Sequence, residues 1–267
     1  MAAASATSDY PRGNGTGGGG WTGADCALLL GLFAFAALRT ASLVFSPLEL
    51  GVDEAQYWLW STGFDFGYYT KPPLTSWIIG LSHSLFGHHE WAVRLPAPWL
   101  HLATSLVLWR AADWLAGPAA GWIAAIIWMT LPSIALGSFV ISTDTPLLLC
   151  WSAGVLALVG VLTGRLRERR GMVFAGGAFG AAMLAKYAAI YGLAGLALFV
   201  LATSVLSRGK DRQKVIGWRG LGLFALGMVV VASPNILWNL ANELTTVRHL
   251  GDNANLDLRS YSLAGSI

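Results

Sequence analysis

Residues 50–74 read LGVDEAQYWLWSTGFDFGYYTKPPL, and long apolar segments come before and after them. The stretch combines an adjacent acid pair, Asp53 and Glu54, with many aromatic residues and a single cation, Lys71, in front of two prolines. Trp and Tyr rings are enriched where protein meets the boundary between membrane and water. The stretch is therefore predicted to be a loop at a bilayer surface, held there by the apolar segments around it.

The composition of the whole chain indicates a polytopic membrane protein. Of its 267 residues, 55% are hydrophobic and only 12% are charged, and the mean hydropathy is +0.57. A soluble domain carries about 25% charged residues. The net charge of +3 is small, and the basic residues form short runs between apolar segments. This pattern is typical of membrane orientation signals, so no nucleic-acid partner is expected.

The apolar segments predict an all-α fold with about seven transmembrane helices. The first segment, 26–45, has about the 20 residues that a spanning helix needs, and Arg39 near one end can snorkel to the interface. The other apolar segments lie at 91–115, 118–140, 145–163, 172–187, 188–206 and 219–238. Residues 1–23 are rich in Ala, Ser, Thr and Gly. They cannot bury enough apolar surface to fold, so we expect a disordered tail.

Two basic clusters predict the orientation in the membrane. The clusters consist of Arg165, Arg167, Arg169 and Arg170, and of Arg208, Lys210, Arg212, Lys214 and Arg219. Short loops this rich in Lys and Arg stay in the cytoplasm. If both clusters are cytoplasmic, the chain crosses twice between them and turns near Lys186 on the external side. Counting back places Asp144 and the whole of 47–90 outside, with a cytoplasmic N-terminus in the plasma (inner) membrane.

The number of spans depends on whether the segment 72–87 crosses the membrane. It is apolar but too short to span comfortably. On a helical wheel, one face holds Leu74, Trp77, Ile78, Leu81 and Leu85, and the polar residues lie largely opposite. This pattern favours an amphipathic helix in the interface. The alternative is an eighth span at 72–87 with the N-terminal tail outside.

Several polar residues at predicted outer ends are candidates for chemistry. A carboxylate in the Asp53-Glu54 pair, partly desolvated among aromatic rings, suits the removal of a proton from a hydroxyl, although solvation explains most acid pairs. Lys71, beside Tyr68 and Tyr69, suits the binding of a phosphate, or it anchors the loop to lipid headgroups. These residues predict a site that faces the external side.

Two further candidates come from later segments. Asp144, in STDTPLL, follows Thr143 at a predicted helix start, so it can serve the helix N-terminus and still face the same cavity. Lys186, at a predicted external helix turn, is either a bare hairpin tip or a second cation that meets an anion. An external site does not meet cytosolic nucleotide sugars, so a membrane-carried substrate is expected.

The ordered series DEAQYW, YYTKPPLTSW, HHEWAVRLP, STDTPLL and LAKY resembles the dolichyl-phosphate-mannose protein mannosyltransferase and lipid A aminoarabinose transferase families. These are membrane glycosyltransferases of the C-type fold, and the resemblance covers about residues 26 to 260. It implies transfer of a sugar, with inversion, from a polyprenyl-phosphate carrier to a lipid or protein acceptor on the external (periplasmic) face. The family's seven-span module with amphipathic helices in the first external loop agrees with the count above.

The resemblance also implies roles for individual residues. It places Asp53, the acid that opens the DE motif, at the reaction centre together with Tyr57. It places Lys71 at the carrier phosphate with Tyr68 nearby, and makes Asp144 a second external carboxylate. Some relatives have a metal-binding Glu immediately before the lysine. Here that residue is Thr70, so the resemblance does not support a divalent cation, and no cofactor is identified.

Family members are about twice as long as this chain. We therefore expect residues 24–267 to form the transmembrane glycosyltransferase core without the C-terminal part of the family. A carrier-lipid flippase or transporter, and an inactive truncated remnant, remain alternatives. Transporters usually place ionisable groups near the middle of the membrane, whereas the candidate residues here lie at predicted outer ends, which favours an enzyme.

Overall fold

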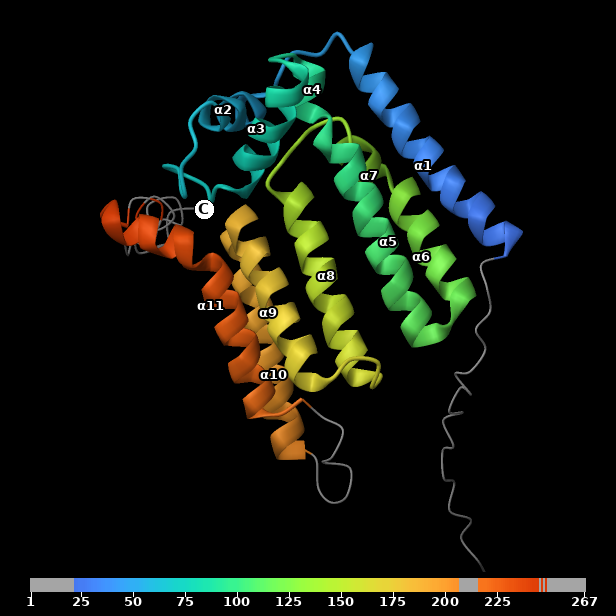
Figure 1. Cartoon of the computed structure of the whole chain (residues 1–267), viewed down its shortest axis with the longest axis vertical. Coiled ribbons are helices and arrows are strands. Elements are labelled where there is room, and N and C mark those ends of the chain that lie inside the picture. Colours follow the sequence, from blue (N-terminus) through green and yellow to red (C-terminus); the bar gives the residue numbers. More distant parts are fainter. Residues whose placement is uncertain (1–21, 207–215, 245, 247, 249–267) are drawn as a thin grey trace, which may run out of the picture.

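The computed structural model describes residues 22–206, 216–244, 246 and 248, and all secondary structure within these residues is helical. The predicted all-α class is confirmed, and Figure 1 shows long helices that run along one another with a group of short helices at one end. The helices are α1 (Gly23–Val44), α2 (Val52–Ser61), α3 (Leu74–Phe86), α4 (Glu90–Arg94), α5 (Pro96–Ala116), α6 (Pro118–Thr130), α7 (Pro132–Gly137), α8 (Asp144–Leu162), α9 (Glu168–Ala185), η1 (Tyr187–Ala189), α10 (Ile190–Leu206) and α11 (Trp218–Ala241).

Four helical stretches in the described part of the chain are long and apolar enough to cross a membrane: Gly23–Val44, Asp144–Leu162, Tyr187–Leu206 and Trp218–Ala241. Each coincides with a predicted span, and together with the shorter apolar helices they fit a polytopic membrane protein. The count of about seven spans stays a prediction.

Two sequence predictions fall wholly or partly outside the described residues. The predicted disordered tail, 1–23, is described only from Thr22 onward. There Thr22 caps α1, because its hydroxyl accepts a hydrogen bond from the backbone N–H of Asp25 at 3.2 Å. Of the second basic cluster, only Arg219 belongs to the described part.

The predicted single helix over 118–140 is wrong, because prolines interrupt the chain. α6 ends at Thr130, Leu131 is extended with a ψ of 133°, and Pro132 begins α7. Proline has no N–H for the helix ladder and disfavours helical geometry in the residue before it. The predicted segment 91–115 is likewise divided at Leu95, between α4 and α5.

Helix α3 turns its polar face toward the protein and its apolar face outward, the opposite of a helix in a soluble protein. Thr75, Ser76 and Ser82 are buried against the protein, whereas Leu81 and Leu85 are 66% and 68% exposed. A helix of 13 residues is about 20 Å long, shorter than a hydrocarbon core of about 30 Å. The outward apolar face and the short length favour the predicted interfacial position over an eighth span.

Arg39 differs from its prediction. Its side chain does not snorkel, because Arg39 is only 5% exposed and its guanidinium donates hydrogen bonds to the Met129 carbonyl and the Ser138 hydroxyl. The first helix is thus tied to both halves of the segment that Pro132 divides.

A buried ion pair joins the short helices to the rest of the fold. Arg94, at the end of α4, donates from Nε to Glu54 Oε1 at 2.9 Å and from Nη2 to Glu54 Oε2 at 2.7 Å. The two side chains are only 5% and 2% exposed. Two parallel hydrogen bonds between a guanidinium and a carboxylate also fix their relative orientation.

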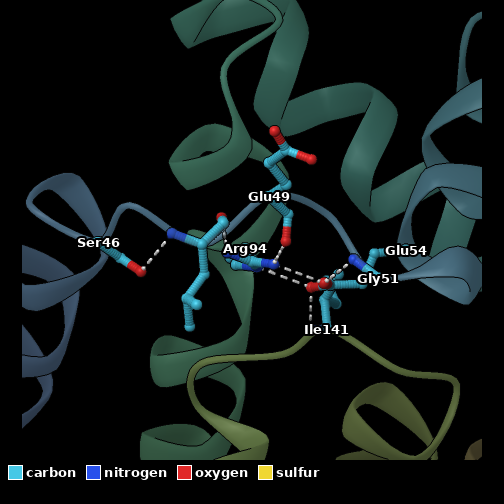
Figure 2. A network of polar contacts seen from close by, with 7 residues as sticks. Ser46, Glu49, Gly51, Glu54, Arg94 and Ile141 are labelled. Carbon is cyan, nitrogen blue, oxygen red and sulfur yellow. Dashed lines mark hydrogen bonds and ion pairs between the residues drawn. The ribbon is translucent and has the colours of Figure 1, made fainter.

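Backbone groups complete this ion pair, as Figure 2 shows. The guanidinium also donates to the carbonyls of Leu48 and Glu49, at 2.8 and 2.7 Å. The carboxylate accepts from the N–H groups of Gly51 and Ile141, both at 3.0 Å. One ion pair therefore holds the linker after α1, the start of α2, the end of α4 and the segment before α8 (Figure 2).

Helices α9 and α11 approach so closely that glycine is required between them. A Cβ on Gly176 would overlap the backbone carbonyl of Phe224, whereas a Cβ on the adjacent Gly177 would lie 3.6 Å from Val231, an ordinary contact. Small residues allow membrane helices to pack backbone against backbone. The two neighbouring glycines therefore differ in what they tolerate.

We expect Gly176→Ala to destabilise the protein by about 1–3 kcal/mol, because the added methyl group forces the two backbones apart. Thermal unfolding in detergent micelles measures this as a lower Tm. Gly177→Ala is the matched control and should leave the Tm near that of the wild type. Equal Tm values for the two variants would contradict the close approach of α9 and α11.

We expect Glu54→Gln to destabilise the protein by about 3–5 kcal/mol, because the substitution leaves the Arg94 charge buried without a counter-ion. The control is Asp113→Asn, which removes the counter-ion of Arg110 in a pair whose arginine side chain is 47% exposed. An exposed pair contributes about 0–1 kcal/mol. A similar loss of Tm in both variants would show that burial of the Glu54–Arg94 pair is not what matters.

Candidate functional site

The acid pair at the start of α2 is divided between two environments. Glu54 is buried in the ion pair with Arg94, and each of its oxygens already accepts two hydrogen bonds. Asp53, one residue earlier, is exposed. The sequence groups both acids as catalytic candidates, but the geometry of Glu54 is that of a structural anchor. Of the two carboxylates, the one at Asp53 is open to a substrate.

Tyr57 brings two predicted carboxylates into one place. Its side chain is only 3% exposed, and this burial raises the pKa of the phenol to about 12. The negative charges of Asp53 and Asp144 contribute to this rise, and a hydrogen bond with the Thr143 side chain acts in the opposite direction. The charges of Asp53, from α2, and of Asp144, from α8, therefore act on the same buried phenol.

Asp144 also forms an ion pair with Lys186, the predicted cation directly after α9. Lys186 Nζ donates to Asp144 Oδ1 at 2.7 Å, and the two side chains are 42% and 51% exposed. Asp144 lies in the first turn of α8, directly after Thr143, where a negative charge interacts favourably with the helix dipole. The structure thus brings together four predicted site residues, Asp53, Tyr57, Asp144 and Lys186.

The loop that carries Lys71 packs against α2. The ring of Tyr68 stacks on that of Trp60 at a centroid distance of 5.1 Å and an interplanar angle of 3°. The hydroxyl of Tyr68 donates to the Gly63 carbonyl at 2.9 Å, and its N–H donates to the Lys71 carbonyl at 3.2 Å. Burial raises the pKa of this phenol as well. Tyr68 therefore shapes the loop as much as it offers a hydroxyl.

The same loop is attached to α11 and to the turn after α9. Asn235 Nδ2 donates to the Phe66 carbonyl at 2.8 Å, and Asn235 Oδ1 accepts from the Tyr187 hydroxyl at 2.8 Å. Gly67 lies against the indole of Trp238 so closely that a Cβ would overlap the ring. The loop is thus fixed between α2 and α11.

These contacts form a continuous circuit at one end of the bundle. Trp60 contacts both Tyr68 and Tyr57, at centroid distances of 5.1 and 6.0 Å. From Tyr57 the circuit continues through Asp144 and the turn after α9 to α11, and returns to the loop. Lys71 is half-buried in this loop, and within the described residues its ammonium group forms no ion pair. Tyr69 is 60% exposed.

Sequence reasoning missed several residues that build the site. Arg94 lies in the motif HHEWAVRLP, but the motif gives no sign that its partner is Glu54. Asn235 and Asn239 lie four residues apart and follow Pro234 in an otherwise apolar helix, a spacing that places both on one helix face. Both are buried, and Asn239 Nδ2 donates to the Tyr187 hydroxyl at 3.1 Å. Two asparagines at this spacing in an apolar segment were the sequence signal that could have revealed this part of the site.

The described residues contain no group of three or more His, Cys, Asp or Glu placed to hold a metal ion. The hydroxyl of Thr70, which stands at the position before Lys71, is buried and has no hydrogen-bond partner among the residues that the structure describes.

Comparison with known proteins gives a consistent result. Residues 70–238 match the family model described as dolichyl-phosphate-mannose-protein mannosyltransferase. The chain is 37% identical over 229 residues to the lipid A galacturonosyltransferase RgtD of Rhizobium johnstonii. This match covers 84% of the chain and 46% of the relative, so the chain spans a little under half the length of that relative. No solved structure matches the chain. The chain belongs to the dolichyl-phosphate-mannose-protein mannosyltransferase family of membrane glycosyltransferases.

Proposed function

We propose that the protein transfers a sugar from a polyprenyl-phosphate carrier to an acceptor at the external face of the membrane, with inversion. The observation that carries the proposal is that the exposed carboxylate of Asp53 and the Asp144–Lys186 ion pair, 2.7 Å long, lie near one buried phenol, that of Tyr57, whose pKa the charges of both acids raise. These groups lie in one circuit of contacts with the loop that holds Lys71. Separate acidic and cationic groups are what this reaction requires.

In the proposed reaction, Asp53 is the general base. It accepts the proton of the acceptor hydroxyl while that oxygen attacks the anomeric carbon. The bond between the anomeric carbon and the phosphate oxygen breaks on the opposite face, and the polyprenyl phosphate leaves with the bonding electrons. If the acceptor is an ionised phosphate, there is no proton to remove, and Asp53 positions the sugar instead.

Lys71 binds the phosphate of the carrier and stabilises the charge that develops when it leaves. Its ammonium group has no ion pair within the described residues, so it is available to an anion. Tyr68 holds the loop backbone at Lys71, and Tyr69, two residues before the cation in the sequence, is exposed. The polyprenyl tail lies in lipid beside the bundle.

Tyr57 stays protonated at physiological pH because its pKa is near 12, so it acts as a neutral hydroxyl rather than as a base. Lys186 neutralises Asp144 in the absence of substrate. This leaves Asp53 as the exposed carboxylate that has no ion pair within the described residues and is open to proton transfer. Asp144 and Lys186 orient the acceptor or the sugar.

Two features support external action. The candidate residues lie at the end of the bundle that also holds α2, α3 and α4 (Figure 1). The turn between α8 and α9, with Arg165 and Arg167, lies at the opposite end. Basic turns favour the cytoplasmic side. The relative's name specifies lipid A and a galacturonosyl group, which supports a glycolipid as acceptor and a hexose-derived sugar as the transferred group.

We expect Asp53→Asn to lower kcat by about 10²–10⁴-fold, the usual contribution of a general base. The assay follows a radiolabelled polyprenyl-phosphate sugar in vesicles that contain the purified chain and a glycolipid acceptor. Asp65→Asn, in the following loop, is the control and should retain wild-type kcat. Undiminished transfer by Asp53→Asn would refute the role of Asp53. A wild-type chain that moves the donor across the bilayer without consuming it would be a flippase.

We expect Lys71→Ala to raise KM for the polyprenyl-phosphate donor by about 10- to 100-fold, because a hydrogen bond to a charged group contributes about 1.5–3 kcal/mol. Lys71→Arg keeps the charge and should lose less. Initial rates at varied donor concentration give KM and kcat for each variant. If Lys71→Ala changes neither constant, the lysine anchors the loop and does not bind the donor.

A further inference from the structure

A buried arginine lies outside the proposed reaction centre. Arg39 of α1 is 5% exposed, and its guanidinium carbon lies 4.4 Å from the centre of the Phe35 ring. No carboxylate pairs with it in the part of the chain that the structure describes. An ionisable side chain inside a membrane bundle is costly, and such residues are usually retained for a function.

The first partner of Arg39 is a carbonyl that the helix break leaves open. Met129 lies in the last turn of α6, and Pro132 prevents α6 from continuing. Carbonyls at a helix C-terminus lack intrahelical partners, and the helix dipole favours a positive charge there. Arg39 supplies a hydrogen-bond donor and a positive charge at this helix end, because its Nη2 donates to the Met129 carbonyl at 2.6 Å.

The second partner is Ser138, the residue directly after α7. Arg39 Nη1 donates to Ser138 Oγ at 3.0 Å, and this hydroxyl in turn donates to the Ile134 carbonyl at 2.7 Å. The end of α7 also packs closely against His101 of α5. A Cβ on Gly137 would lie only 3.1 Å from His101 Nε2. The guanidinium therefore spans the break and fixes where α7 ends.

The residues after Ser138 lead directly to the proposed site. Ile141 donates its N–H to Glu54, Thr143 interacts with the Tyr57 hydroxyl, and Asp144 pairs with Lys186. The segment 139–143 has no helical hydrogen-bond ladder of its own. Its path is set at one end by Arg39 and further along by the buried ion pair.

We propose that Arg39 is a positioning residue for the transfer reaction. It bridges the ends of α6 and α7 and so holds the segment 139–143 that presents Asp144 beside Tyr57. Its catalytic consequence rests on the proposed function, whereas its effect on the segment does not. Arg39 is buried and donates to Met129 and Ser138, so its loss should act on kcat and leave the phosphate-binding loop unchanged.

The test uses a buried reporter on the segment. Ile141 is 1% exposed, so Ile141→Cys, in a background with Cys26→Ala and Cys150→Ala, should react slowly with a water-soluble maleimide in detergent micelles. Adding Arg39→Met, which keeps bulk but removes the donors, should raise the labelling rate by roughly tenfold or more through local opening. Arg110→Met removes an exposed arginine and should leave the rate unchanged.

Labelling of Arg39→Met no faster than of Arg110→Met would overturn the proposal. If Arg39→Met does not fold, Ser138→Ala, which removes one of the two bridges, decides: faster labelling supports the proposal and an unchanged rate overturns it. In the transfer assay, Arg39→Lys should lower kcat and leave KM for the donor unchanged. A raised KM with an unchanged kcat would overturn the proposal. Labelling needs no activity, so a wild-type chain without transferase activity refutes the proposed function alone.

Discussion

The buried contact between Glu54 and Arg94 is the constraint on which the site depends. Two opposite charges removed from water are stable only when their remaining hydrogen-bonding positions are filled. Here backbone groups from Leu48 to Gly51 and from Ile141 fill them. The linker after α1, the helix that carries Asp53 and the segment before α8 must therefore adopt one arrangement together. The positions of Asp53 and Asp144 follow from this shared requirement.

The adjacent acids Asp53 and Glu54 show how one short motif serves two purposes. Successive side chains on a helix point about 100° apart, so one acid of the pair faces the protein and the other faces outward. The inward acid orients α2, and the outward acid keeps its solvent exposure next to a buried tyrosine. The position of the chemical group is thus fixed by its immediate neighbour.

Hydrophobic segment lengths predicted the helical class and the stretches at 26–45, 145–163, 188–206 and 219–238, because burial in lipid requires uninterrupted apolar residues. The alternation of ends also predicted that Asp144 and Lys186 lie on the same side of the membrane as the loop after α1. The break at Pro132 was missed because proline at the first position of a helix is as compatible with a new helix as with a kink. The partners of Arg94 and Asn235 lie 40 and 169 residues away, and no local pattern reveals such pairs.

The contact between Gly67 and the Trp238 indole sets the height of the Lys71 loop above α11. Because the backbone itself rests on a flat aromatic face, the separation equals the thickness of two groups in van der Waals contact and cannot shrink further. Any larger residue at position 67 acts as a spacer that lifts the loop. The depth at which the Lys71 loop is held is therefore determined by Gly67, a position that has no side chain.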